Sequence, residues 1–264
     1  MKSTARTGKA INVANLELLL AYLIAMGAKY NPKNQTLTVA NVTIKLNKSK
    51  AKLQLVSDAF TIFNSARNLR RDEFKTLKKL CTRIINALIA AGASEAIIAN
   101  AKTINRKIQG ARAKAIVAVP PINPIVEIPV TEIEVTSENG VNKSTLDEII
   151  NISVSQQGFD SKEFNFAKLL TLLIAEPLYD PNETDLTTAN LTIKQTAMQT
   201  TNSDVKTATP GYTNAITDCD VELYASKTGL VDYSKLIKAY CLSVLDSSNA
   251  NYKKINHINF RNVS

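Results

Sequence analysis

The stretch YNPKNQTLTVANVTIK, at residues 30–45, returns as YDPNETDLTTANLTIK at residues 179–194. Nine of the sixteen positions are identical, all at a single offset of 149 residues. A second match lies just upstream, where NLELLLAYLIA at residues 15–25 has a counterpart in NFAKLLTLLIA at residues 165–175. Self-similarity at a fixed spacing predicts a tandem duplication of one structural unit.

Each copy has the pattern of an apolar helix, a turn and a longer second helix. We predict the first helix over residues 13–28 and over 164–175, because both segments are apolar and both precede a turn with an Asn-Pro or Asp-Pro pair. The second helix is predicted to begin near Leu37 in one copy and near Leu186 in the other. The expected fold class is therefore all-α.

The later part of the first copy predicts nearly uninterrupted helix. No Gly or Pro lies between Gln35 and Gly92, and apolar residues recur at three- and four-residue steps, the spacing of one helix face. We expect one very long helix, or two in near succession with a break around residues 70–74. A last helix over residues 94–112 would close the unit.

The second copy departs from this pattern in its later half. Its Pro-Gly pair at residues 210–211 is expected to interrupt the helix, because proline lacks the backbone N–H that the helix needs. Two shorter helices are therefore predicted over residues 212–227 and 232–245. The tail at residues 252–260 carries no clear pattern.

Between the copies, residues 116–140 are rich in β-branched residues and contain four Pro. Proline excludes a central strand, so an extended linker or an edge strand is predicted, and a semi-rigid spacer fits equally well. The expected architecture is two tandem helical-bundle repeats with long helices, a basic one over residues 1–115 and an acidic one over 159–264. An extended Pro-rich, β-branched linker over 116–158 would join them.

Charge is divided unevenly between the two halves. There are 21 Lys and Arg against 5 Asp and Glu up to Val119, and 11 against 18 from Pro120 onward, within an overall formal net charge of +9. The basic residues that we predict for interaction follow helix faces: Arg67, Arg70, Arg71, Lys75, Lys78, Lys79, Arg83, Arg106 and Lys107. The acidic residues that we predict to oppose them are Asp218, Asp220 and Glu222.

Several interpretations of these charges remain open. The acidic repeat of one molecule could meet the basic repeat of another, which builds a ring if the contact closes and a filament if it does not. Docking of the two repeats within one chain would use the same complementarity. The basic face could instead bind nucleic acid non-specifically, although no nucleic-acid-binding motif accompanies it and aromatics make up only 6% of the residues. Solvated helix faces are the simplest alternative.

The sequence offers little equipment for catalysis. His257 is the only histidine, and no phosphate-binding, dinucleotide-binding or metalloprotease motif is present. The three cysteines are widely spaced, so neither a disulfide framework nor a zinc site is indicated. We therefore predict no enzyme activity, no catalytic residue, no cofactor, no metal site and no small-molecule substrate.

The apolar run at residues 18–28 superficially resembles a signal peptide. Its counterpart in mid-chain favours a core helix instead, and eleven residues are fewer than the roughly 20 that cross a bilayer. We therefore expect no membrane span and a cytoplasmic location.

Three segments carry a family resemblance: VANVT at residues 39–43, KTINRKIQG at 102–110 and SVSQQ at 153–157. They resemble an uncharacterised family of duplicated helical proteins from Bacteroidota genomes, and the likeness covers most of the chain. The resemblance implies a helical bacterial protein. Because that family has no established activity, it implies no functional residues.

These observations predict a structural protein that associates with itself, as a scaffold or filament-like assembly, through its basic and acidic repeats. The alternative is non-specific nucleic-acid binding through the basic repeat. The expected partner is a second copy of the chain, with nucleic acid as the other candidate.

Overall fold

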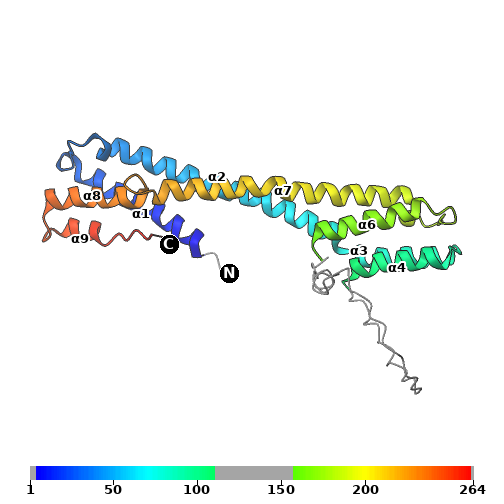
Figure 1. Ribbon diagram of the computed structural model, residues 1–264. Helices are drawn as coiled ribbons and strands as arrows, with labels where there is room; N and C mark the ends of the chain where they lie inside the picture. The colour runs from blue at the N-terminus through cyan, green and yellow to red at the C-terminus, as the bar shows by residue number, and fades with distance from the viewer. Residues whose placement is uncertain (1–3, 111–156, 263–264) are drawn as a thin grey trace, which may run out of the picture. The chain divides into compact units, whose positions relative to one another are not determined.

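The computed structural model describes residues 4–110 and 157–262 of the chain. These residues form α-helices and short 3-10 turns, with no β-strand among them, so the predicted all-α class is confirmed for this part of the chain (Figure 1). The expected linker lies outside the described residues, apart from Gln157 and Gly158.

The described elements are named in chain order. The first half contains α1 (Thr4–Met26), η1 (Gly27–Lys29), η2 (Gln35–Leu37), α2 (Val39–Lys75), α3 (Leu77–Ala90) and α4 (Glu95–Gln109). The second half contains α6 (Phe159–Ile174), η3 (Thr184–Leu186), α7 (Thr188–Tyr224), α8 (Leu230–Leu245) and α9 (Ala250–Asn256).

In the first half the helix boundaries differ from those expected. Helix α1 starts nine residues earlier than predicted, at Thr4. The break in the long helix falls at Thr76, after 37 residues of α2, and not around residues 70–74. Helix α4 begins after Ser94, whose hydroxyl accepts a hydrogen bond from the backbone of Ile97, as expected of an N-cap. It ends at Gly110, whose φ of 78° is the left-handed geometry that glycine supplies without strain.

The predicted interruption at Pro210 is wrong, because α7 continues through it for 37 residues. A proline removes one backbone N–H from a helix, and here Pro210 and the following Gly211 are both exposed. Packing on both sides holds the helix: Val205 is buried, and the Tyr212 ring stacks on Phe63 at 5.3 Å. Helix α8 starts at Leu230, two residues earlier than expected, and the unassigned tail forms α9.

The chain folds into two compact units, and each unit contains parts of both halves of the sequence. Unit 1 comprises residues 1–71 and 201–264, and unit 2 comprises residues 72–200. Helices α2 and α7 each contribute residues to both units. The compact units therefore differ from the two sequence repeats that we delimited at 1–115 and 159–264.

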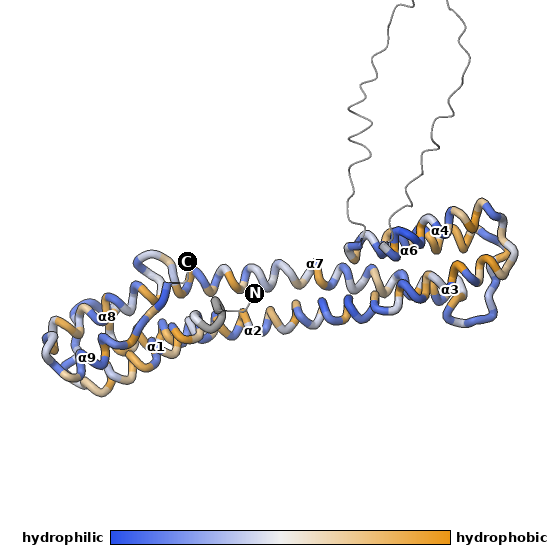
Figure 2. Tube along the Cα trace, turned by 90° about the horizontal axis from the view of Figure 1, so that it is seen from below, coloured by the Kyte–Doolittle hydropathy of each residue, from blue (hydrophilic) through white to orange (hydrophobic). Residues whose placement is uncertain are grey.

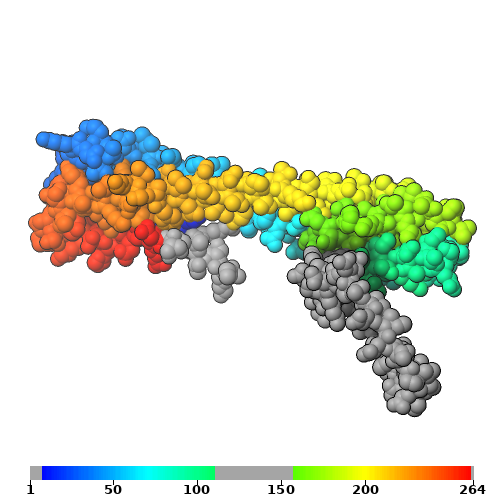
Figure 3. All heavy atoms as spheres, viewed as in Figure 1, coloured from blue at the N-terminus to red at the C-terminus, as the bar shows by residue number. Residues whose placement is uncertain are grey.

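Unit 1 packs α1, α8 and α9 with the first part of α2 and the last part of α7. Its core includes the wholly buried residues Leu16, Leu19, Leu23, Val42, Cys219, Leu223, Leu230, Ile237, Cys241 and Ile255. In the space-filling view, α8 and α9 pack directly against one another (Figure 3). The chain after α9 is held to α1, because the Asn12 side chain donates to the carbonyl of Arg261 at 2.8 Å and accepts from its N–H at 2.9 Å.

Unit 2 packs α3, α4 and α6 with the first part of α7. Helix α4 lies against both α3 and α6. The core includes the wholly buried residues Cys81, Ile84, Leu88, Ala101, Ile108, Phe166, Leu169 and Met198. Phe74, near the end of α2, meets Phe159 of α6 edge-to-face at 5.0 Å.

The repeated segment makes the same local contact in both units. The Tyr30 hydroxyl donates to the carbonyl of Leu37 at 2.7 Å in unit 1, and the Tyr179 hydroxyl donates to the carbonyl of Leu186 at 2.9 Å in unit 2. Both tyrosines are buried, and burial raises the pKa of Tyr179 to about 12. A hydrogen bond therefore fixes the turn that leads into each 37-residue helix.

Candidate interaction sites

In unit 1, a lysine near the start of α2 binds the end of α7. The Lys45 ammonium lies 2.8 Å from a carboxylate oxygen of Glu222, 3.1 Å from the carbonyl of Glu222 and 2.9 Å from the carbonyl of Thr228. A cation at a helix C-terminus satisfies carbonyls that lack intrahelical partners and interacts favourably with the helix dipole. Lys45 thereby joins the first half of the chain to the second.

Unit 2 contains the reciprocal contact. The Lys194 ammonium, near the start of α7, lies 2.7 Å from a carboxylate oxygen of Glu73 and 2.6 Å from its carbonyl, close to the end of α2. Lys45 and Lys194 hold matching positions in the repeated segment. These lysines and Glu73 were not among the residues predicted for interaction, although the identity of the lysine in both copies was the available signal.

Glu222 is more deeply enclosed than Glu73. Its carboxylate is 5% exposed and also binds Lys48 at 3.0 Å and the Ser49 hydroxyl at 3.2 Å. Burial acts to raise the pKa of Glu222, but the hydrogen bonds and charges of Lys45 and Lys48 outweigh it and hold the pKa below its usual value of 4.5. Glu222 is therefore an ionised, buried acid at the centre of a lysine cluster.

The other two acidic candidates also bind lysines within unit 1. Asp220 binds Lys9 at 2.6 Å, and Asp218 binds Lys52 at 2.8 Å. The acidic set is thus engaged by lysines between residues 9 and 52. Among the described residues, no ion pair joins it to the arginines and lysines that we expected to oppose it.

The predicted basic set is divided between the two units. Its members lie on α2 (Arg67, Arg70, Arg71, Lys75), on α3 (Lys78, Lys79, Arg83) and in the last turn of α4 (Arg106, Lys107). In unit 1 the Arg67 guanidinium lies over the Phe63 ring, 5.4 Å from its centroid. In unit 2 the Lys78 ammonium donates to the carbonyl of Gln109 at 2.8 Å, which brings α3 to the basic end of α4.

A second lysine, Lys162 on α6, lies near Lys78 at this end of unit 2. Partial burial lowers the pKa of Lys162 on α6, and the neighbouring charge of Lys78 lowers it further. Arg106 and Lys107 are exposed in the adjacent last turn of α4. We call Lys78, Arg106, Lys107 and Lys162 the basic end of unit 2.

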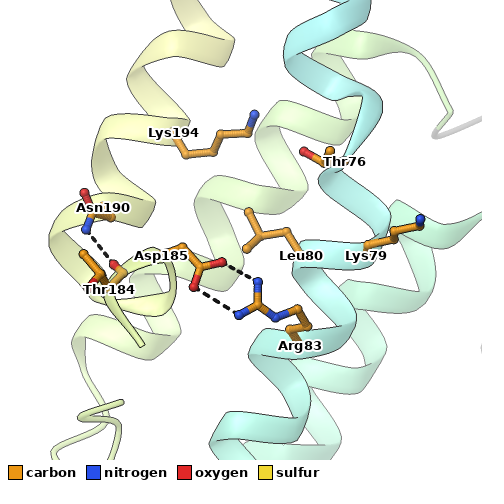
Figure 4. Close-up of a pocket in the computed structure, with 8 residues that line it drawn as sticks. All are labelled: Thr76, Lys79, Leu80, Arg83, Thr184, Asp185, Asn190 and Lys194. Atoms are coloured by element: carbon orange, nitrogen blue, oxygen red, sulfur yellow. Dashed lines mark hydrogen bonds and ion pairs between the residues drawn. The ribbon is translucent and has the colours of Figure 1, made fainter. Parts of the chain in front are cut away.

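Unit 2 also has an open pocket of about 710 Å³ between α3 and the start of α7 (Figure 4). Its lining comprises Thr76, Lys79, Leu80, Arg83, Thr184, Asp185, Asn190 and Lys194. Figure 4 shows Arg83 reaching from α3 to Asp185, with both guanidinium ends on the carboxylate. The hydrogen bond and charge of Arg83 lower the pKa of Asp185. The pocket thus combines three cationic side chains with a polar rim.

Unit 1 has a groove of about 720 Å³ between α2 and α7. It is lined by Ala59, Thr61, Ile62, Ser65, Ala66, Leu69, Asp204, Thr207, Ala208, Gly211 and Tyr212. Ile62 and Leu69 are 63% and 59% exposed, and Leu55, which lies seven residues before Ile62 on α2, is 52% exposed. We call Leu55, Ile62 and Leu69 the α2 stripe, because their seven-residue spacing places them in one line.

One helical stretch, residues 8–29, is long and apolar enough to cross a membrane by length and composition alone. This corrects the length argument that we drew from residues 18–28. Leu16, Leu19 and Leu23 of α1 are wholly buried in unit 1, as in the core helix that the sequence predicted, whereas the outer side of α1 is exposed.

The described residues contain no cluster of His, Cys, Asp and Glu that could hold a metal ion. His257 is exposed beyond α9. The three cysteines lie in the cores, where burial raises the pKa of Cys81 to about 12 and that of Cys241 to about 11. They are therefore packed thiols.

Comparison of the chain with protein-family models, curated proteins and solved structures found no significant match to any of them.

Proposed function

We propose that this is a structural protein that associates with itself, in which two copies of a helical unit interlock within one chain and an apolar face binds further chains. The observation that carries the proposal is the α2 stripe. Its three large apolar side chains are each more than half exposed, and two of them, Ile62 and Leu69, line a groove built from two helices of unit 1. Contiguous apolar surface of this kind marks interaction sites on soluble proteins.

The charges have a different role in this proposal. Lysines from the first half of the chain already bind Asp218, Asp220 and Glu222, so opposite charge favours docking of the two halves within a chain. Contact between chains then depends on apolar burial, which salt does not screen. An enzyme role is not part of the proposal.

Light scattering of the full chain across a salt series tests this assembly. We expect oligomers at micromolar concentration that persist at high salt. The variant Ile62→Gln/Leu69→Gln should shift the mass toward the monomer, because it removes two apolar side chains from the groove without adding charge. Val221→Gln, at a site 60% exposed on α7, is the matched control and should leave the mass unchanged.

Two results contradict the proposal. One is a protein that stays monomeric at both low and high salt. The other is an assembly that dissolves at high salt but is insensitive to Ile62→Gln/Leu69→Gln, which would assign the contact to charge.

The basic end of unit 2 supports a second candidate, non-specific binding of nucleic acid. Counterion release from phosphates would give an affinity that falls steeply with salt. Residues 1–115 contribute to both compact units, so a gel-shift assay needs the full chain. Arg106→Gln/Lys107→Gln should weaken retardation of DNA and reduce its salt dependence.

The control for this assay is Lys253→Gln/Lys254→Gln, which removes two basic residues from the last turn of α9 in unit 1. Equal losses in the two variants would mean that net charge alone determines retardation. No retardation of DNA or RNA by the wild-type chain at low salt would eliminate this candidate.

A further inference from the structure

The outer face of α1 is apolar although it faces away from its own core. Ile11, Leu18 and Ile24 are 37%, 48% and 60% exposed. At 100° per residue, the exposed apolar positions lie within an arc of about 140°. They are Ala10, Ile11, Ala14, Leu18, Ala21, Ile24 and Ala25, with Glu17 as the one charged residue among them. Figure 2 shows the hydrophobic character that runs along α1.

The equivalent helix of unit 2 shows that core packing does not require this face. In α6, Leu169 and Leu173 are buried just as Leu19 and Leu23 are in α1. The outer positions of α6, however, are mostly polar. In the alignment that pairs residue 15 with residue 165, Asp160, Ser161, Lys168 and Thr171 replace Ala10, Ile11, Leu18 and Ala21. Phe164 and Ile174 of α6 remain apolar and exposed in place of Ala14 and Ile24. What distinguishes α1 is that residues 10, 11, 18 and 21 are apolar as well, which makes its outer face continuous.

Positive charge borders this face. On the α2 side, Lys50 forms an ion pair with Glu17 and is 46% exposed. Lys29, also exposed, follows the C-terminal end of α1.

Unit 1 as a whole carries a large excess of positive charge. Its residues 8–71 and 201–262 include 17 Lys and Arg against 8 Asp and Glu. Anionic membrane surfaces attract basic proteins, and apolar side chains on an interfacial helix add binding energy by entering the boundary between headgroups and acyl chains.

We propose that unit 1 docks onto an anionic lipid surface through the outer face of α1. The face is wider than a coiled-coil seam, which uses two positions in seven, and its breadth suits a flat apolar boundary. Because the opposite side of α1 is in the core of unit 1, the helix lies along the surface and does not cross the bilayer. This activity is separate from self-association through the α2 stripe.

A single tryptophan reports the contact directly, because the chain contains none. Leu18→Trp in the full chain should shift its emission to the blue when phosphatidylcholine vesicles containing phosphatidylglycerol are added. Ile62→Trp, on the α2 stripe, is the matched reporter outside the face and should not shift. Pure phosphatidylcholine vesicles should produce a much smaller shift, and added salt should weaken binding to the anionic vesicles.

Flotation with the same vesicles measures the affinity. Leu18→Gln/Ile24→Gln should reduce partitioning onto anionic vesicles by about tenfold or more, because two large apolar contacts are lost. The control Phe164→Gln/Ile174→Gln changes two residues of comparable exposure on α6 and should have no effect. Circular dichroism checks that each variant remains helical.

Absence of vesicle binding by the wild-type chain overturns the proposal, as does equal binding by the wild type and Leu18→Gln/Ile24→Gln. If that variant instead lowers the oligomer mass in lipid-free buffer while vesicles bind neither protein, the face binds a second copy and the lipid proposal is wrong. Self-association is measured separately, by light scattering of Ile62→Gln/Leu69→Gln without vesicles. Either proposal can therefore fail while the other holds.

Discussion

The two compact units differ beside the turn that leads into their 37-residue helix, where unit 1 has a tyrosine and unit 2 has an open pocket. In unit 1, the Tyr233 hydroxyl of α8 donates to the carbonyl of Thr36, beside the turn that leads into α2. When Leu77 and Leu230, the first residues of α3 and α8, are aligned, Leu80 takes the place of Tyr233 in unit 2. There the corresponding space is the open pocket beside Asp185.

A tyrosine reaches the turn carbonyl, whereas a leucine is too short and has no donor. The two units therefore share their turns and helix starts and still differ in surface chemistry. In unit 1 the partly buried Tyr233 fills the space beside the turn. In unit 2 the corresponding space, which we call the notch, stays open and is lined by Lys79, Arg83 and Lys194. Outward-facing residues diverge more readily than core residues because no packing constrains them.

The largest expected difference concerns the two helix-end glutamates. Glu222→Ala should destabilise the chain by about 2 to 3 kcal/mol, because it leaves Lys45 without its carboxylate at a site with little access to water. Glu73→Ala should cost about 1 kcal/mol, since that pair is partly solvated. Urea unfolding of both variants measures the difference, and equal losses would show that the deeper burial of Glu222 has no energetic consequence.

Replacing Tyr233, which fills in unit 1 the space that corresponds to the notch, should have the next largest effect. Tyr233→Leu is expected to cost about 2 kcal/mol through the lost hydrogen bond and the space left behind. Tyr233→Phe, which keeps the ring, separates the hydrogen bond and should cost about 1 kcal/mol. Thermal unfolding monitored by circular dichroism provides both values. If Tyr233→Leu unfolds at the same temperature as the wild type, the side chain of Tyr233 contributes nothing to the stability of unit 1.

A smaller effect should appear as pH dependence in unit 1. The pKa of Glu222 lies below 4.5 in the folded chain, so its contribution to stability is present at neutral pH and is lost as the pH falls below 4.5 through the folded-state pKa. Glu222→Gln should therefore differ most from the wild type near pH 7 and converge with it in acid. Urea midpoints at several pH values test this, and a constant gap between the two proteins would assign the stabilisation to packing alone.

The smallest expected effect is at the rim of the open pocket. Asp185→Asn removes the ion pair with Arg83, but both groups are solvent-exposed, and exposed pairs contribute little. We expect no measurable change in the urea midpoint of this variant. A clear loss of stability would reveal that the exposed pair holds α3 against the turn, and would make the two units more alike than the pocket suggests.

Much of the local structure could be predicted from the repeated segment. Its shared residues make short-range contacts: Asn41 donates to the carbonyl of Gln35 at 2.6 Å, and Asn190 makes the same bond to Thr184. Such bonds join residues six positions apart, so nine identities within sixteen residues were enough to predict two equivalent turns and helix starts.

The candidate sites were less predictable. We predicted that Asp218, Asp220 and Glu222 would oppose the basic set, and this stays a prediction. The lysines that bind them within unit 1 could not be predicted, because Lys45 and Glu222, for example, are 177 residues apart and several lysines had the right charge. Attraction between charges depends on their distance and not on their identity, so the sequence showed which residues could form ion pairs but not which lysine would pair with which acid. Pro210 failed as a helix breaker for a related reason: Val205 and Tyr212 pack on either side of it.

The helical class, the repeated segment and the turn that begins each long helix could be predicted from the order of the residues, since these features depend on neighbours within a few residues. Three features became visible only in the folded chain: each compact unit takes parts from both halves, the lysines of one half bind the acids of the other, and α1 exposes an apolar side. The physical reason is that burial and ion pairing depend on which distant helices meet, and helical periodicity specifies a face without specifying what covers it.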